Sequence, residues 1–151
     1  MNSTIAVVFL IAWVAITLTS VMVIPGPLSD KNTFLQGFVT HEFLSFMGVI
    51  VTITLASAAN LFVEMNKIED RHNKDIFSSS KKDVQDSAYA LVGALIASLT
   101  VVVAKPWFSN AWAERGQAGV NCAALGIVAF SIMIMIDLIQ AAFKLDPRKT
   151  P

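Results

Sequence analysis

Apolar residues in this chain are gathered into four long runs that short polar segments separate. The runs cover residues 5–24, 43–63, 88–104 and 120–143. Each run reaches or approaches the roughly 20 residues that a helix needs to cross about 30 Å of hydrocarbon. The pattern predicts an all-α membrane protein, a four-transmembrane-helix bundle whose second and third helices extend into the cytoplasm as a helical hairpin.

Capping and helix-breaking residues predict where these helices begin and end. Pro25 removes a backbone donor after the first run, and Thr40 is a competent N-cap with Glu42 in the first turn that follows. The serines at 78–80 predict a break, and Pro106 predicts the end of the third helix because the residue before proline avoids the α region. We expect one transmembrane domain, 1–151, with helices at about 5–24, 41–64 extending to about 76, 81–105 and 119–144.

The second helix is expected to continue beyond the membrane, because apolar residues recur there at spacings of three and four within charged sequence. The segment 64–86 carries five basic and six acidic residues. A lipid-binding basic patch would carry one sign of charge. The segment is therefore either a solvated pair of helix extensions or a docking surface for a cytosolic protein. The candidate docking residues are Ile68, Arg71, His72, Ile76 and Phe77.

The distribution of Lys and Arg predicts the orientation. Five lie between the second and third helices and three follow the fourth, whereas the two other loops hold three together. Cytoplasmic segments carry the excess of basic residues, so both termini are expected in the cytoplasm. The first run lacks a basic start and an Ala-x-Ala site, so we expect it to be retained rather than cleaved. A bacterial inner membrane is the default location.

Polar and small residues follow one face of the second helix. Polar groups that face lipid are costly, so such a face either packs against other helices, which is the commoner case, or lines a hydrated path. The candidate pore or polar-face residues are Ser45, Thr52, Asn60, Glu64, Asp137 and Gln140, the last two from the fourth helix.

Asp137 is the most informative single residue. It lies about six residues, or roughly 9 Å, inside the end of the last apolar run. An acidic side chain costs up to about 2.5–3.5 kcal/mol at the centre of a bilayer, so we expect Asp137 to face protein or water. Asp137 would then either belong to an ion or proton path near its cytoplasmic mouth or be a structural partner of Asn60, Lys67 or Arg71.

Small residues at spacings of three and four predict close helix approach in two further places. They are Gly93 and Ala97 in the third helix, and Gly119, Ala123 and Gly126 in the fourth. These faces suit a contact within the chain or between copies of it. Four helices enclose little volume, so a conducting path would lie between the subunits of a homo-oligomer.

The sequence gives no sign of catalysis or of a cofactor. His41 and Glu42 resemble half of a zinc protease motif, but Ser45 stands where the second histidine belongs. The other histidine, His72, lies in charged sequence, which disfavours a bis-histidine haem. Nucleotide-binding and nucleophile motifs are missing, and a net charge of zero gives no reason to expect nucleic acid. We expect no enzyme, no metal site and no cofactor.

The leading hypothesis is an oligomeric channel or pore-forming effector that is gated through its cytoplasmic hairpin. A second hypothesis is a non-catalytic membrane anchor that recruits a cytosolic protein through residues 64–86. A third is an accessory chain of a larger membrane complex. Each predicts the lipid bilayer as surroundings, and the small-residue faces favour a homo-oligomer.

Overall fold

A computed structural model describes residues 3–73 and 75–144 of the chain. It is 91% helical, and these residues contain no strand. The elements, in order, are α1 (Ser3–Val23), the short 3-10 helix η1 (Gly26–Leu28), α2 (Thr33–Phe38), α3 (His41–His72) and α4 (Ser78–Lys144). Lys74, Arg148 and Lys149, which enter the charge count for orientation, lie outside the described residues.

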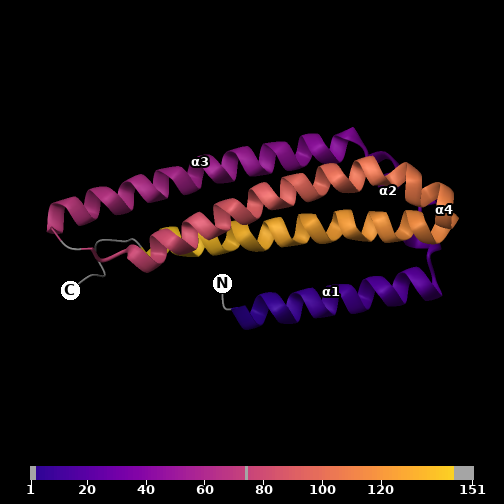
Figure 1. Ribbon diagram of the computed structural model, residues 1–151, viewed down its shortest axis with the longest axis horizontal. Helices are drawn as coiled ribbons and strands as arrows, with labels where there is room; N and C mark the ends of the chain where they lie inside the picture. Colours follow the sequence, from indigo (N-terminus) through magenta and orange to yellow (C-terminus); the bar gives the residue numbers. More distant parts are fainter. Residues whose placement is uncertain (1–2, 74, 145–151) are drawn as a thin grey trace.

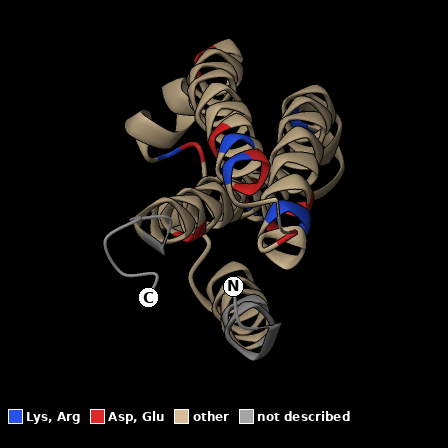
Figure 2. Ribbon diagram, turned by 90° about the vertical axis from the view of Figure 1, so that its left-hand side faces the viewer, with Lys and Arg blue, Asp and Glu red and all other residues tan. Residues whose placement is uncertain are grey.

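The helix α4 is folded back on itself at Ala113. This residue has φ 46° and ψ −129°, which are not helical dihedrals. A first arm, residues 78–112, and a second arm, residues 114–144, therefore run antiparallel. Together with α1 and α3 they form four long rods that lie roughly along one direction (Figure 1). Viewed along the rods, α1 lies to one side of the other three (Figure 2).

Two helices among the described residues, α3 and α4, are long and apolar enough to cross a membrane. A third candidate is the pair formed by residues 11–23 and 26–38, which is bent by 115°. These spans support an all-α membrane protein. The number of crossings and the projection of the hairpin into the cytoplasm stay predictions.

The start of α3 follows the expected capping. Thr40 is the N-cap, its side chain accepts the backbone N–H of Glu42 at 3.4 Å, and Glu42 places its charge in the first turn. The helix ends at His72 because Asn73 adopts the left-handed conformation, with its N–H donated to the carbonyl of Glu69. The 32 residues of α3 span about 48 Å, so the helix is longer than the hydrocarbon core.

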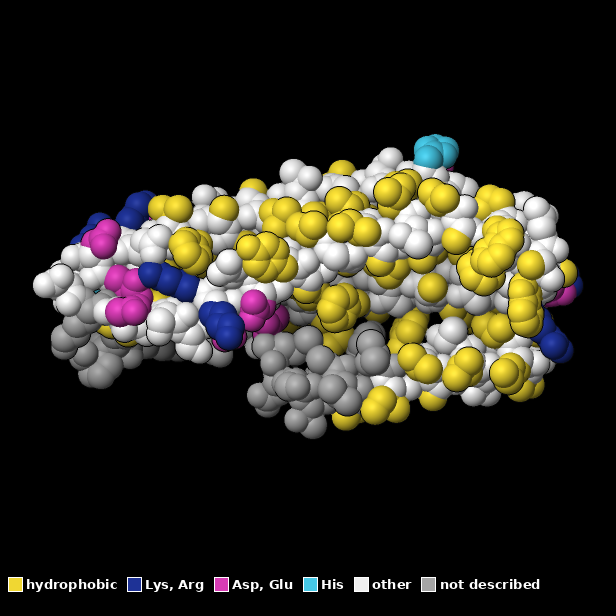
Figure 3. Space-filling view, viewed as in Figure 1, with side chains coloured by type: hydrophobic (Ala, Val, Ile, Leu, Met, Phe, Trp, Pro, Cys, Tyr) yellow, Lys and Arg dark blue, Asp and Glu magenta, His cyan; other side chains and the backbone are white. Residues whose placement is uncertain are grey.

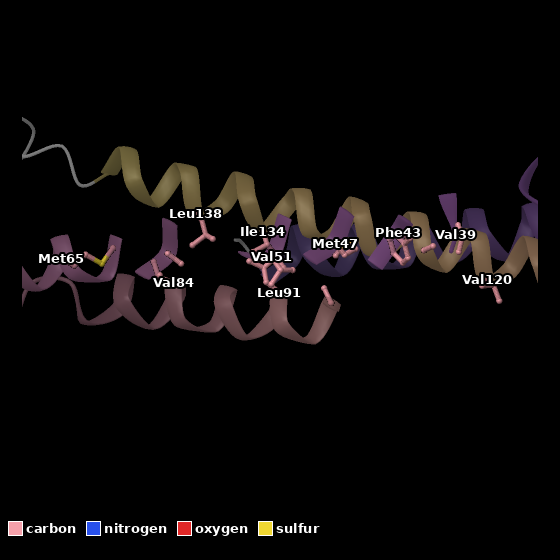
Figure 4. Packing of buried hydrophobic residues seen from close by; sticks show 13 residues of the cluster. Val39, Phe43, Met47, Val51, Met65, Val84, Leu91, Val120, Ile134 and Leu138 are labelled. Carbon is pink, nitrogen blue, oxygen red and sulfur yellow. The ribbon is translucent and has the colours of Figure 1, made fainter. Parts of the chain in front are cut away.

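The core lies where one face of α3 meets both arms of α4 (Figure 4). Phe43, Met47 and Val51 recur every fourth residue of α3 and are at most 3% exposed. Leu91 of the first arm and Ile134 of the second pack in the same cluster. Within a bilayer this contact stabilises the fold through close packing, because lipid tails are as apolar as the side chains that they would replace.

The prediction that the third helix ends before Pro106 is wrong. Residues 101–112 are helical, and α4 continues through Pro106 to the fold at Ala113. A proline inside a helix removes one backbone hydrogen bond and disfavours the helical conformation of the residue before it, but tertiary contacts can offset this cost. Here the preceding residue, Lys105, is held by an ion pair with Asp30 at 3.0 Å.

The predicted break at the serines is also displaced. Residues 78–80 form the first turn of α4, and the described residues between α3 and α4, which are 73 and 75–77, are not helical. The backbone N–H of Lys81 donates to the carbonyl of Phe77 at 2.8 Å, which starts the helix one turn earlier than expected. Three serines can thus sit inside a first helical turn, where their side chains compete least with the backbone.

Candidate functional site

The polar face of α3 lies on the side of the helix away from the core. Ser45, Thr52, Asn60 and Glu64 are all exposed. The hydroxyl of Ser45 donates to the carbonyl of His41 at 3.0 Å, so it is satisfied within its own helix. The packing expected of this face does not occur within one chain.

An open groove of about 590 Å³ lies at the hairpin end of α3, between this helix and the second arm of α4. Its lining includes Asn60, Glu64, Ile68, Arg71, His72 and Ala142. The structure therefore brings two of the candidate pore residues together with three of the candidate docking residues. Glu64 also pairs with Lys67 at 2.6 Å, on the exposed surface beside the groove.

Asp137 and Gln140 are not among the residues that line this groove. The second arm faces α3 with Leu138, Ile139 and Ala142. At 100° per residue, Asp137 lies on another side of the arm and shares its face with Phe130, seven residues earlier. Asp137 is half-buried and Gln140 is exposed. Asp137 therefore lies outside the groove that Asn60 and Glu64 line.

The turn between α3 and α4 is held by Glu69. One carboxylate oxygen accepts the backbone N–H of Phe77 at 2.7 Å, and the other forms an ion pair with Lys81. The hydrogen bond from Lys81, followed by that from the N–H of Phe77, lowers the pKa of Glu69 below its ordinary value. Basic and acidic residues, blue and red on the ribbon of Figure 2, lie close together at this end of the molecule.

The two apolar residues of the turn have different surroundings. Phe77 packs against the core cluster, whereas Ile76 is 51% exposed. Of these two docking candidates, Ile76 offers a free apolar surface and Phe77 fixes the turn.

A buried polar cluster at the opposite end of the molecule was not predicted. Asp30, in the loop before α2, accepts from Lys105 of the first arm at 3.0 Å and from the amide of Asn121 of the second arm at 3.1 Å. The same amide donates to the carbonyl of Leu28 at 2.8 Å. Asn121 is fully buried, and its side-chain oxygen has no partner among the described residues. The cluster joins the loop to both arms of α4.

A second ion pair lies beside this cluster. Lys31 contacts Glu114 at 3.0 Å, and Glu114 also lies 3.5 Å from the hydroxyl of Ser29, which is fully buried. In the sequence alone, Lys31 and Lys105 contribute only to the count of basic residues that predicts the orientation. One signal in the sequence could have predicted this cluster. Acidic, basic and amide residues occur at the ends of three different apolar runs, and these ends meet in the fold.

Two adjoining apolar hollows, of about 370 and 480 Å³, lie between α1 and the arms of α4. The molecule is visibly hollowed between α1 and the rest (Figure 3). The predicted small-residue faces line these hollows rather than a closed contact between the arms: Gly93, Ala97, Gly119, Ala123 and Gly126.

At position 126, where α1 touches the second arm, the absence of a side chain allows a close contact between the two helices. A Cβ atom at Gly126 would lie 2.4 Å from Nε1 of Trp13. At Gly93 and Gly119, by contrast, nothing lies within 4 Å of such an atom. The Trp13 indole therefore occupies the space that a side chain at 126 would need, while Gly93 and Gly119 leave open volume beneath α1.

The described residues hold no group of three or more His, Cys, Asp and Glu side chains that could bind a metal ion. The single cysteine, Cys122, is buried in the second arm of α4. Comparison of the chain with protein-family models, with curated proteins and with solved structures found no match.

Proposed function

We propose that this chain is an integral membrane protein that assembles into a homo-oligomer around an ion or solute path, which α3 lines. One observation carries the proposal: Ser45, Thr52, Asn60 and Glu64 of α3 are exposed on the side away from the core, where they alternate with exposed apolar residues such as Val49 and Ile53. The natural location is a bacterial inner membrane with both termini in the cytoplasm, because the basic residues are concentrated on that side.

The polar residues on the exposed side of α3 are more stable in contact with protein or water than with lipid. A hydroxyl such as that of Ser45 can satisfy itself on its own helix, but the amide of Asn60 and the carboxylate of Glu64 offer more polar atoms than one helix can satisfy. Thr52 lies eleven residues, or about 16 Å, beyond the start of α3 and so near the bilayer centre. A second copy of the chain, or water held between copies, covers these groups at the least cost.

The inner end of the path has a means of control. Asn60 and Glu64 continue directly into the groove that Arg71 and His72 line. A signal that moves the hairpin would move these charges relative to the mouth of the path. Gating through the hairpin therefore follows from the continuity of the polar face and the groove.

Ion flux through proteoliposomes that hold the purified protein tests the proposal. Thr52→Leu and Asn60→Leu should lower or abolish flux from an oligomer whose mass is unchanged in native mass spectrometry. Val103→Leu is the control, since Val103 is an exposed apolar residue of the first arm of α4 and lies outside α3. Asp137→Asn locates the path: an effect of this change alone would place the path on the α1 side of the second arm and contradict a lining by α3.

A second candidate function is a membrane anchor for a cytosolic protein. It is favoured by the exposed Ile76 on a turn that Glu69 holds in place. In this case Ile76→Asp should abolish binding of the partner while Thr52→Leu leaves it unchanged. Binding that survives Ile76→Asp would remove this candidate.

A further inference from the structure

We propose that the hollow between α1 and the arms of α4 binds one anionic phospholipid, with an acyl chain in the apolar hollow and its headgroup phosphate on Arg115. This site is separate from the path proposed along α3, because no residue of α3 lines either hollow.

The shape of the hollow suits an acyl chain. The two hollows share Ala123 and follow the second arm from Gly116 to Phe130. This distance is about 21 Å at 1.5 Å per residue, which exceeds the roughly 15 Å of one leaflet. Almost all of the lining is apolar, and a groove that opens sideways in a bilayer is filled by the lipid that surrounds it.

The charge at one end of the hollow selects the headgroup. Arg115 is the charged residue of the lining, and no acidic side chain lines either hollow. Residues 24–40 and residues 105–118 together hold five charged residues. Four of them form two ion pairs, Lys105 with Asp30 and Lys31 with Glu114. Arg115 is the fifth, and it has no ion-pair partner among the described residues.

The surroundings of Arg115 place it at the depth of a headgroup. Trp112, three residues before it and across the fold at Ala113, is 68% exposed and lines the same hollow, and Trp107 on the first arm is 70% exposed. Exposed tryptophans are typical of the interface between lipid and water. An exposed guanidinium at this level can donate two parallel hydrogen bonds to a phosphate.

Native mass spectrometry of the full chain tests the proposal. The protein is released from nanodiscs of phosphatidylcholine that contain a minor fraction of phosphatidylglycerol, and the lipids that stay bound are counted per chain. Wild type should retain one phosphatidylglycerol. Arg115→Gln should lower the retained fraction about fivefold, the effect of one basic residue near an anionic surface. Lys82→Gln is the matched control, because Lys82 is exposed on the first turns of α4, away from the hollow.

A second pair of variants tests the acyl chain without changing charge. Gly119→Leu should displace the lipid by filling the hollow, since its first side-chain atom meets nothing within 4 Å. Gly37→Leu makes the same change at an open position of α2, outside the hollow, and should leave retention unchanged. The proposal is overturned if phosphatidylcholine and phosphatidylglycerol are retained equally, or if Arg115→Gln matches wild type. It is also overturned if Gly119→Leu changes the oligomer mass instead of the lipid count, which would assign the hollow to a second copy.

Discussion

Removal of the Asp30 carboxylate should destabilise the fold more than the loss of any surface ion pair. Asp30 and Lys105 are 19% and 12% exposed and lie 3.0 Å apart. Loss of one partner of a buried pair costs about 3–5 kcal/mol, because the other charge stays buried without compensation. The remaining exposure of both groups places Asp30→Asn at the lower end, about 3 kcal/mol. Asp30→Ala should cost about 1 kcal/mol more, since it also removes an acceptor for Asn121.

Unfolding in mixed micelles of mild detergent and sodium dodecyl sulfate, followed by circular dichroism, measures these differences. Glu64→Gln is the control: it breaks the Glu64–Lys67 pair, whose partners are 59% and 57% exposed, and should change stability by less than about 1 kcal/mol. Lys105→Met added to Asp30→Asn should recover part of the loss, because it removes the uncompensated charge. An Asp30→Asn variant as stable as Glu64→Gln, or a double variant less stable than the single one, would refute a buried pair at this end.

Two further predictions concern the attachment of α1 and the turn of the hairpin. Gly126→Ala should destabilise the protein in a thermal melt by about 1–3 kcal/mol, because its methyl group overlaps Trp13. Gly93→Ala should be neutral or slightly stabilising, since nothing lies near its methyl group. Equal melting temperatures for the two variants would contradict the contact between α1 and the second arm. The lowered pKa of Glu69 stabilises the turn above about pH 4.5, and this contribution is lost as the pH falls through the lowered value. Hydrogen exchange at the amide of Phe77, corrected for its intrinsic pH dependence, should speed up there in wild type but not in Glu69→Gln; identical profiles would exclude the link.

Local signals in the sequence predict the helices well, and one case shows why. The N-cap at Thr40 involves only side-chain and backbone groups within three residues, so it can be inferred without the rest of the fold. Pro106 fails as a stop signal because its effect depends on what holds the residue before it. That residue, Lys105, is held by Asp30, 75 positions away, and nothing in the local sequence indicates this contact.

The contacts between helices were harder to predict for the same reason. Glycines 93, 119 and 126 are visible in the sequence as places where a helix could approach closely, but the sequence does not say which helix covers them. In the structure Trp13 covers only Gly126, and the other two face a hollow. The polar residues of α3 were found by their spacing, and the cluster around Asn121 was not, because its members come from three separate segments.

The reversal of α4 at a single residue, Ala113, has a consequence for how this chain can change its length. With no loop between the arms, one inserted residue near the fold would rotate the second arm by about 100° relative to the first. Asn121 would then turn away from Asp30, and Gly126 away from Trp13. Insertions and deletions at residues 110–116 should therefore disrupt the fold, whereas those in the turn between α3 and α4 should be tolerated. The position of the reversal thus determines which residues of the second arm face the loop before α2 and which face α1.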